Sequence, residues 1–220
     1  HKRISQKENC KVNGEVSGQA DYTPVFLSDM PSYFYSKNFP VDVAMISVSP
    51  PDERGFCTFG PNLDTSKAAV EMANKVIALV NPRIPVTHGN TLLHQSRIDY
   101  MVECDRELYG PPEETTLSEI ETKIGKLIAD NLVENGATLQ LGIGAIPDSS
   151  LVAMKNHKDL GVHTELLGGG VIDLIEKGVI NNSKKSLMPG KVVTTFAFGS
   201  PKFYRFLHNN PMIRKGIQLS

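Results

Sequence analysis

The stretch 138–165 constrains the fold of this chain more than any other part of the sequence. Residues 138–141 predict a short β-strand, and Gly142 and Gly144 directly after it permit a tight turn. Pro147 is expected at the first position of a following helix, where its missing N–H would be unpaired in any case. The strand therefore ends by directing free backbone amides toward the start of a helix.

The second half of this stretch predicts a helix and another strand. Helical spacing continues through Leu151 and Met154, and Gly161 is expected to end the helix. Residues 162–167 then predict a parallel strand with Glu165 near its end. Because the carboxyl ends of parallel strands lie at one edge of a sheet, the free amides and the Glu165 carboxylate are expected at the same edge. The stretch predicts one βαβ unit that carries an anion cradle and a carboxylate.

The turn at Gly142 and Gly144 fits more than one kind of site. A dinucleotide-binding turn has the pattern Gly-x-Gly-x-x-Gly and an acidic residue about 20 positions later. Glu165 stands near that place, but Pro147 occupies the position of the third glycine. A cradle for a phosphate or an oxyanion needs only the free amides, and some such turns merely connect a strand to a helix. The glycines alone leave these readings open.

Six longer segments, in a defined order, carry a resemblance to a known family. They read SPPDERGFC (49–57), THGNTLLH (87–94), QLGIGAIPD (140–148), GVHTE (161–165), GVIDLIEKGVI (170–180) and FAFGS (196–200). Together they closely resemble the acetyl-CoA hydrolase/transferase family, and within it most of all the 4-hydroxybutyrate CoA-transferases. The resemblance extends from about Asp21 to Met212.

The resemblance implies two open α/β domains with mostly parallel sheets of the CoA-transferase (NagB/RpiA-like) type, both incomplete. The stiff, polar run 110–114 predicts the connection between them. Residues 1–110 would then be part of an N-terminal domain, and residues 111–220 part of a C-terminal domain that carries the nucleophile. Because family members have further sequence on both sides, the chain is expected to be an internal portion of a longer enzyme and inactive alone. A true short homologue is the alternative.

The resemblance also implies a set of site residues. Glu165 matches the family's nucleophilic glutamate, which attacks the thioester and then holds CoA as a covalent glutamyl thioester. Gln140 and the backbone amides of Gly142, Ile143 and Gly144 are implied as the oxyanion-binding and CoA-binding groups. The plainer alternatives are that Glu165 is a strand-end carboxylate paired with a lysine or arginine, and that Gln140 faces solvent.

Weaker site candidates are Asp52, Gly168 and Gly169. Asp52 lies in a segment that resembles the first-domain loop facing the cleft, although it could simply cap its own turn. The run from Gly168 to Gly170 stands where many relatives have Ser-Asp-Gly, so the acyl preference is expected to differ. His163 lies inside a strand and is expected to be a core residue without a catalytic role.

The function that the resemblance implies is an acyl-CoA:carboxylate CoA-transferase of the acetate, butyrate or 4-hydroxybutyrate class. Its substrates would be an acyl-CoA and a short-chain carboxylate, and coenzyme A would be a substrate rather than a permanently bound cofactor. The alternatives are an acyl-CoA hydrolase, in which water resolves the same intermediate, and a non-catalytic sensor that binds CoA or a nucleotide.

Composition argues against other classes of function. With 23 basic and 24 acidic residues the formal net charge is -1, which offers no bulk attraction to nucleic acid or to a membrane surface. No apolar run approaches the roughly 20 residues that span a bilayer. Cys10, Cys57 and Cys104 lack paired short spacings, which indicates a reducing compartment. A cytoplasmic location is expected, or the mitochondrial matrix if the source is eukaryotic, and a homo-oligomer is left open.

No metal site is predicted from the histidines. His88 and His94 lie near Asp99 and Cys104 in the sequence. However, a spacing of six residues does not place two imidazoles on one helical face.

The remaining sequence repeats the alternation of strands and helices. Residues 1–18 lack periodicity and predict a loop. Residues 41–48 and 75–80 are apolar runs that predict strands buried on both faces. Between them, Asp64 or Thr65 is expected to cap a helix that runs to about residue 74.

A longer helix is expected to open the second half of the chain. Thr116 or Ser118 can cap it, and its apolar stripe is expected to pack in the core. Residues 192–196 predict a further strand and residues 202–209 a short helix. The stripe consists of Ile120, Ile124, Leu127, Ile128 and Val133.

Overall fold

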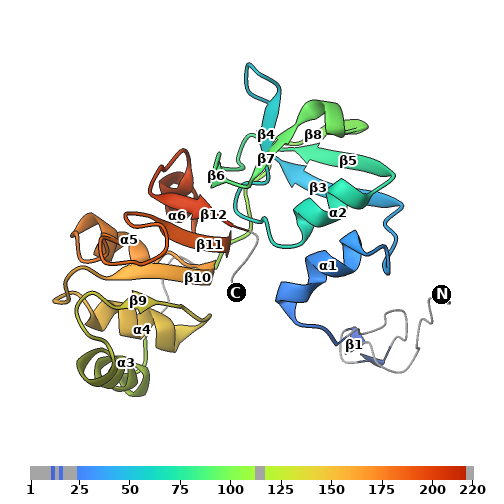
Figure 1. Ribbon diagram of the computed structural model, residues 1–220. Coiled ribbons are helices and arrows are strands. Elements are labelled where there is room, and N and C mark those ends of the chain that lie inside the picture. The colour runs from blue at the N-terminus through green and yellow to red at the C-terminus, as the bar shows by residue number, and fades with distance from the viewer. Residues whose placement is uncertain (1–10, 13–14, 17–23, 112–116, 217–220) are drawn as a thin grey trace.

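The computed structural model describes residues 11–12, 15–16, 24–111 and 117–216. These residues form an α/β structure with two parallel sheets (Figure 1). The five-stranded sheet has the order β6-β12-β11-β10-β9, and the three-stranded sheet has the order β3-β5-β8. Two antiparallel pairs, β1-β2 and β4-β7, complete the described strands. The predicted α/β class with mostly parallel sheets is confirmed.

The three-stranded sheet is built from the first half of the chain. Its strands alternate with one helix, α2, and with a loop region that contains the β4-β7 pair. The elements before residue 111 are β1 (Lys11–Val12), β2 (Glu15–Val16), η1 (Leu27–Asp29), α1 (Met30–Tyr35), β3 (Val43–Val48), β4 (Phe56–Thr58), α2 (Ser66–Met72), β5 (Lys75–Val80), β6 (His88–Gly89), β7 (Leu92–His94), η2 (Gln95–Arg97) and β8 (Tyr100–Glu103).

The five-stranded sheet is built mainly from the second half of the chain. Its four strands after residue 111 are adjacent in the order in which the chain makes them, and all pair in parallel. The elements are α3 (Glu119–Leu132), β9 (Thr138–Leu139), α4 (Ala145–Ala153), β10 (Gly161–Leu167), α5 (Val171–Glu176), β11 (Val192–Ala197), α6 (Pro201–Leu207) and β12 (Ile213–Lys215).

The predicted βαβ unit is present as β9, α4 and β10. Residues 138–141 were expected as the first strand, but β9 ends at Leu139. The reason is a contact with β10: both backbone groups of Leu141 lie at hydrogen-bond distance from the Thr164 hydroxyl, rather than from the backbone of a neighbouring strand. Pro147 is the third residue of α4 rather than the first. It is still in the first turn, where a backbone N–H has no partner within the helix.

Gly161 does not end the helix as expected. The helix α4 ends at Ala153, and Gly161 is instead the first residue of β10. A Cβ atom at this position would lie 2.5 Å from the Lys185 side chain. The glycine is therefore required by close packing rather than by a helix end.

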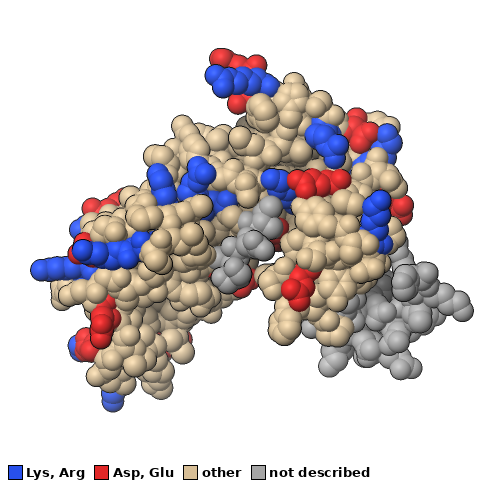
Figure 2. All heavy atoms as spheres, in the orientation of Figure 1, with Lys and Arg blue, Asp and Glu red and all other residues tan. Residues whose placement is uncertain are grey.

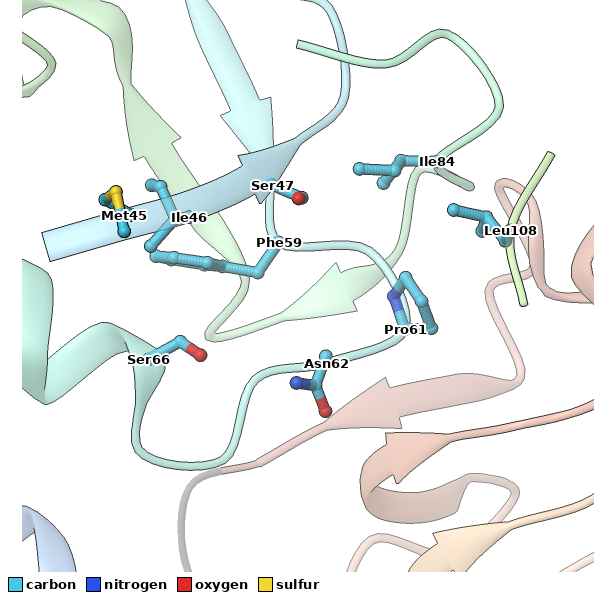
Figure 3. A pocket seen from close by; sticks show the side chains of 9 residues that line it. All are labelled: Met45, Ile46, Ser47, Phe59, Pro61, Asn62, Ser66, Ile84 and Leu108. Carbon is cyan, nitrogen blue, oxygen red and sulfur yellow. The ribbon is translucent and has the colours of Figure 1, made fainter. Parts of the chain in front are cut away.

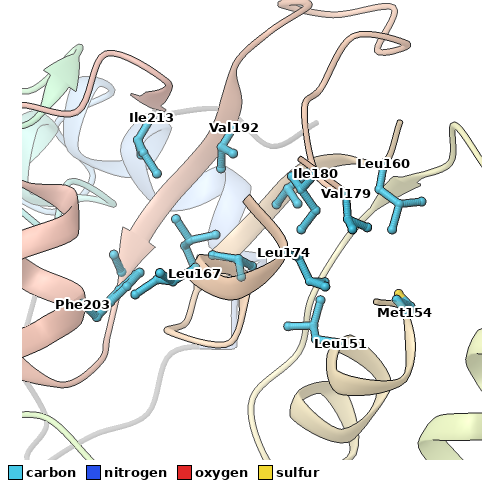
Figure 4. Close-up of a cluster of buried hydrophobic side chains, with 14 of the residues drawn as sticks. Leu151, Met154, Leu160, Leu167, Leu174, Val179, Ile180, Val192, Phe203 and Ile213 are labelled. Atoms are coloured by element: carbon cyan, nitrogen blue, oxygen red, sulfur yellow. The ribbon is translucent and has the colours of Figure 1, made fainter. Parts of the chain in front are cut away.

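The helices α4, α5 and α6 share one cluster of buried apolar side chains with the five-stranded sheet (Figure 4). The strands step across the sheet in one direction, and right-handed crossovers of that kind place the connecting helices on the same face. The most buried members include Leu160, Val162, Leu167, Val171, Val192, Phe203, Leu207 and Ile213.

In the three-stranded sheet, β3 and β5 bury only one face, and all four residues of β8 are exposed. Residues 41–48 were expected to be buried on both faces, and this was wrong for β3. Ala44 and Val48 are buried, whereas Val43 is 47% exposed and Met45 is 81% exposed. The same alternation appears in β5, where every second residue is buried. The cause is that α2 and the β4-β7 region pack against one face of this sheet.

The capped helix is α3, and its cap is Ser118. The Ser118 hydroxyl accepts a hydrogen bond from Glu121 N, and the Glu121 carboxylate accepts one from Ser118 N, which makes a capping box. The alternative cap, Thr116, lies outside the described residues.

The expected core stripe of α3 was wrong in part. Ile120 is 72% exposed and Leu127 is 55% exposed. The helix instead turns its small residues, Gly125 and Ala129, inward. A Cβ atom on Gly125 would clash with Ser149 of α4, so this contact depends on glycine. Close approach of two helices at small residues decided the orientation over the larger apolar stripe.

The two halves of the chain are tied together by strand pairing and hydrogen bonds. β6, from the first half, pairs with β12 at the edge of the five-stranded sheet. Pro61 O accepts hydrogen bonds from Ala197 N and from Lys215 Nζ, both at 2.8 Å. The division into residues 1–110 and 111–220 stays a prediction, and most of the expected connection and of the N-terminal loop lies outside the described residues.

Within the described ranges, no helix is both long and apolar enough to cross a bilayer.

Candidate functional site

The turn between β9 and α4 presents backbone amides at the surface. Gly144 directly precedes the helix and has φ 120° and ψ −177°, a conformation that strains a residue with a Cβ atom. Gly144 has no side chain that could cap the helix. Gly142, Ile143 and Gly144 are all exposed. The first N–H groups of α4 therefore have room for an anion or an oxyanion.

Thr164 of β10 holds this turn in place. Its buried hydroxyl lies 2.9 Å from Leu141 N and 3.0 Å from Leu141 O. Gln140, in contrast, is exposed, and its side-chain amide donates to the neighbouring Leu141 O at 3.2 Å. Sequence reasoning missed Thr164. The signal was the period of two along a strand, which puts Thr164 and Glu165 on opposite faces.

Glu165 lies two residues before the end of β10 and is half-buried. Its backbone oxygen accepts a hydrogen bond from the Thr194 hydroxyl at 3.0 Å. No described residue forms an ion pair or a hydrogen bond with its carboxylate. Because Thr164 is the residue that contacts the turn, Glu165 projects from the other face of the strand, together with the half-buried His163.

The glycine run after β10 lies beside the start of α4. A Cβ atom on Gly170 would lie 3.3 Å from Asp148 Oδ1 and 3.1 Å from Leu151 Cδ1, both on α4. A Cβ atom on Gly168 would have no described atom within 4 Å. The structure therefore brings the glycine run and the first turns of α4 to the same edge of the sheet.

Asp148 is a second residue at this edge that sequence reasoning did not select. Asp148 as a whole is exposed, but partial burial of its carboxyl group raises the pKa of that group. Within the described ranges, no group donates a hydrogen bond to it. Its place in the first turn of α4, next to the glycines, was the available signal. An acidic residue there is common for helix stability alone, which is why the pattern did not single it out.

Phe198 follows β11 at the same edge. Its N–H donates to Leu167 O at 3.1 Å, so it lies directly beside the start of the glycine run. Its side chain is 43% exposed. Ile143, in the turn between β9 and α4, is 77% exposed.

Asp52 lies far from these residues, in the loop between β3 and β4 at the top of Figure 1. Its carboxylate accepts hydrogen bonds from Arg54 N at 2.9 Å and from Phe56 N at 2.8 Å. These contacts close its own turn. No described contact joins Asp52 to the edge that carries Glu165.

The histidines and Asp99 have other contacts. His94 Nδ1 lies 2.8 Å from the Ser96 hydroxyl, and the ring packs edge-on against Phe56. Asp99 pairs with Lys75 at 2.7 Å. In the described part of the chain, no three potential metal ligands come together.

A pocket of about 240 Å³ lies between β3 and the loop that leads to α2 (Figure 3). Its lining is mostly apolar and contains no titratable side chain. It is separate from the glycine-rich edge. The lining residues are Met45, Ile46, Ser47, Phe59, Pro61, Asn62, Ser66, Ile84 and Leu108.

Charged side chains of both signs are interspersed on the face seen in Figure 2. This distribution agrees with the formal net charge of -1. That face therefore offers no extended surface of one sign for a polyanion.

Comparison with known families and proteins gives a consistent result. Residues 4–109 match the family described as the acetyl-CoA hydrolase/transferase N-terminal domain. The chain is 50% identical over 206 residues to the 4-hydroxybutyrate coenzyme A transferase of Clostridium kluyveri, which covers 93% of this chain and 47% of that protein. It is 47% identical over 205 residues to the succinyl-CoA:acetate/propanoyl-CoA:succinate CoA transferase of Fasciola hepatica. This match covers 93% of this chain and 42% of that protein.

Solved structures give the same relationship. The crystal structure of 4-hydroxybutyrate CoA-transferase from Porphyromonas gingivalis matches with a TM-score of 0.82 and 42% identity, covering 90% of this chain and 50% of that one. The crystal structure of RipA from Yersinia pestis matches with a TM-score of 0.84 and 35% identity, and the match covers 90% of this chain and 45% of that one. The chain thus spans about half the length of the relatives it matches. By its family match and by these relatives, the chain belongs to the acetyl-CoA hydrolase/transferase family.

Proposed function

We propose that this protein is an acyl-CoA:carboxylate CoA-transferase of the acetate, butyrate or 4-hydroxybutyrate class. The observation that carries the proposal is the 50% identity, over 93% of the chain, to an enzyme named 4-hydroxybutyrate coenzyme A transferase. Further relatives named as CoA-transferases, at 47%, 42% and 37% identity, support the same reaction class. The substrates would be an acyl-CoA and a short-chain carboxylate.

The proposed mechanism uses Glu165 as a nucleophile. A carboxylate oxygen of Glu165 attacks the thioester carbonyl and forms a carbon–oxygen bond. The carbon–sulfur bond then breaks, CoA leaves as a thiolate, and the acyl group stays on Glu165 as a mixed anhydride. The thiolate then attacks the glutamyl carbonyl and releases the first carboxylate, which leaves CoA on the glutamate as a thioester. A second carboxylate repeats these steps in reverse order, which transfers CoA to it and restores Glu165.

The oxyanion formed in each attack needs hydrogen-bond donors. The exposed amides at Gly142, Ile143 and Gly144, at the uncapped start of α4, support this role, and Gln140 is a further candidate. One preorganised donor in such a site is typically worth about 2.7–4 kcal/mol of transition-state stabilisation.

The proposed mechanism requires the Glu165 carboxylate to reach a thioester bound at the edge of the sheet. Glu165 lies two positions before the end of β10, which is about 7 Å along a strand, and no described contact links its carboxylate to the turn. Its side chain is half-buried and has no ion-pair or hydrogen-bond partner among the described residues, which supports a chemical role.

Transfer and hydrolysis are distinguished by the acceptor. The full-length gene product is incubated with butyryl-CoA, with and without acetate, and the CoA species are separated. We expect acetyl-CoA to form in proportion to acetate. Release of free CoA at a rate independent of acetate would instead indicate the hydrolase, a function named for relatives at only 23% and 27% identity. Binding without any turnover would indicate the sensor.

The nucleophile is identified by trapping. The full-length gene product is incubated with acyl-CoA and treated with borohydride, which reduces a glutamyl thioester. We expect the mass change in the peptide that contains Glu165. The variant Glu165→Asp should lose nearly all turnover, because its carboxylate is retracted by one methylene, whereas the matched variant Glu176→Asp, at the exposed end of α5, should not. Modification of a different peptide would reject Glu165 while leaving the transferase assignment intact.

A further inference from the structure

Thr195 of β11 lies directly beside Glu165 of β10 in the five-stranded sheet. The paired residues on either side of them are Thr164 with Thr194 and Leu166 with Phe196. Residues opposite each other on neighbouring parallel strands point to the same face of the sheet, and such strands are about 4.8 Å apart. The Thr195 hydroxyl is therefore within reach of the long Glu165 side chain.

The Thr195 hydroxyl, unlike those of its neighbours, makes no described contact. Thr164 Oγ1 contacts both backbone groups of Leu141, and Thr194 Oγ1 donates to Glu165 O at 3.0 Å. Thr195 is only 5% exposed, yet its hydroxyl forms no hydrogen bond with a described residue. Because buried hydroxyls in folded proteins nearly always have a partner, this one is free to bind another group.

This hydroxyl is also not sealed inside the core. Across the ranges that the structure describes, the one fully enclosed side-chain nitrogen or oxygen atom without a partner is Asn182 Nδ2. The unpaired Thr195 hydroxyl therefore keeps some contact with the space outside. Glu165, beside it, is half-buried, and its carboxylate likewise has no described partner. Two unpaired polar groups thus lie next to each other on one face of the sheet.

The proposed mechanism needs a hydrogen-bond donor at this place. When the CoA thiolate attacks the glutamyl carbonyl, negative charge develops on an oxygen of the Glu165 carboxyl group itself. The glycine turn is held by Thr164, whose side chain lies on the opposite face of β10 from Glu165. No described contact connects the amides of that turn to the Glu165 carboxylate. The glutamyl oxyanion therefore calls for a donor on its own face of the sheet.

We propose, on the basis of the proposed function, that Thr195 is a catalytic residue whose hydroxyl donates a hydrogen bond to the glutamyl oxygen of Glu165. The sulfur of CoA attacks the glutamyl carbon and forms a carbon–sulfur bond, while the C=O electron pair moves onto the oxygen that accepts from Thr195. As the carbonyl re-forms, the bond to the bridging oxygen of the anhydride breaks, and the acyl group leaves as a carboxylate with that electron pair. Thr195 keeps its proton throughout.

The test follows the second half of the reaction in the full-length gene product. The glutamyl-CoA form is prepared with butyryl-CoA, the excess substrate is removed, and the loss of protein-bound CoA after mixing with acetate is measured by mass spectrometry. Attack of acetate on the glutamyl thioester places negative charge on the same oxygen. Thr195→Val keeps the shape of the side chain and removes the hydroxyl. It should slow this loss about 100-fold, because one oxyanion donor is typically worth about 10²–10³ in rate.

The variant Thr195→Ser separates chemistry from packing. It keeps the hydroxyl and loses a methyl group, so its rate should stay close to that of the wild type. A role in packing alone predicts the reverse order, with Thr195→Val close to the wild type and Thr195→Ser slower, and that order would overturn the proposal. As a matched control, Thr91→Val removes a buried hydroxyl that donates to Thr87 O, and it should leave the rate unchanged.

A second pair of variants decides the matter if Thr195→Val does not fold. Thr195→Ser and Thr195→Ala are both smaller than the wild-type residue and differ from each other only in the hydroxyl. Thr195→Ala should be slowed as strongly as the valine variant is expected to be, relative to Thr195→Ser. Equal rates in these two variants would reject a catalytic hydroxyl.

The failure of Thr195 and the failure of the proposed function are separable. Wild-type protein that transfers CoA, with unchanged rates in the Thr195 variants, would contradict the role of Thr195 alone. Attachment of CoA to a peptide without Glu165 would remove both residues from the mechanism but leave the transferase assignment intact. Wild-type protein that transfers no CoA would contradict the proposed function, and the role of Thr195 with it.

Discussion

The two parallel sheets of this protein follow the same stepwise plan but differ in what they expose. In the five-stranded sheet, four of the six residues of β11 in a row, 192–195, are buried, so both faces of this inner strand are covered. In the three-stranded sheet, Met45 and Val43 of β3 and Tyr100 and Val102 of β8 are exposed. The strands of the two sheets are similarly apolar. The difference in their exposure therefore comes from where each strand lies in the fold.

The difference follows from what packs on each face, because hydrogen-bonded neighbours lie in the plane of a sheet and cover only the edges of a strand. In the three-stranded sheet, α2 and the β4-β7 region cover one face. Stepwise right-handed crossovers also put the connecting segments on one face. Parallel sheets are normally covered on both faces, so the open face of the three-stranded sheet is the least typical surface of the protein. Burial is thus a property of the whole sheet and not of one strand.

The largest expected effect comes from the core of the five-stranded sheet. Phe203 of α6 is fully buried. Phe203→Ala should lower the free energy of unfolding of the 220-residue chain by about 3–5 kcal/mol, since it removes buried surface and leaves a cavity. Urea denaturation measures this change. A loss below about 1 kcal/mol would show that the two sheets do not differ in packing as described.

Lys215 of β12 gives the next largest effect, and it depends on pH. Burial lowers the pKa of its ammonium group to about 7, although Asp64 opposes the shift. The unfolded chain, with a lysine pKa of about 10.4, therefore binds more protons than the folded chain between pH 7 and pH 10. Stability rises with pH in that window, by up to about 1.4 kcal/mol per pH unit from this group.

The pH effect is tested by chemical denaturation at pH 7, 8 and 9. The variant Lys215→Met should lose the part of the rise that Lys215 contributes, while Lys202→Met, at an exposed position of α6, should keep it. Identical pH profiles for the wild type and Lys215→Met would contradict the lowered pKa of Lys215 in the folded chain.

A smaller effect is expected at the start of α3. Ser118→Ala removes the side chain that accepts a hydrogen bond from Glu121 N, and loss of such a cap costs about 1 kcal/mol. Ser118→Asp, which can also accept that hydrogen bond, should restore most of the loss. Thermal denaturation compares the three proteins. Full stability in Ser118→Ala would mean that packing of α3 on α4 alone positions this helix.

The smallest effect is expected on the open face of the three-stranded sheet. Met45 is 81% exposed, so Met45→Ser should change the stability of the 220-residue chain by less than about 0.5 kcal/mol. The same substitution in the full-length gene product sharpens the comparison. A loss of about 2 kcal/mol there would show that this face is covered in that protein, and the difference between the sheets would then belong only to the 220-residue chain.

Several features of the fold could be predicted because they depend on local chemistry. Ser118 and Glu121 determine a helix start through their own hydrogen bonds. Gly144 allows a turn that a residue with a Cβ atom resists, since it has φ 120°. The run 162–167 predicted β10 to within one residue. In each case the deciding interactions lie within a few positions of one another.

Other features could not be predicted because they depend on contacts between distant segments. The outward position of Ile120 and Leu127 follows from the fit of Gly125 against Ser149, on another helix. The early end of β9 follows from the Thr164 hydroxyl, 23 positions from Leu141. A hydrophobic pattern identifies an apolar face but not the partner that covers it.

The candidate site divides in the same way. The sequence by itself determined that two glycine runs follow neighbouring strands and that a carboxylate lies near the end of one of them, because parallel strands in a βαβ unit must end at one edge. Only the tertiary structure decided that Thr164 rather than Glu165 contacts the turn, and that Asp148 and Phe198 border the glycines. The physical reason is that the chain connectivity of a βαβ unit fixes the edge of the sheet at which its parallel strands end. The direction of each side chain is set by register and packing, which depend on residues far away in the sequence.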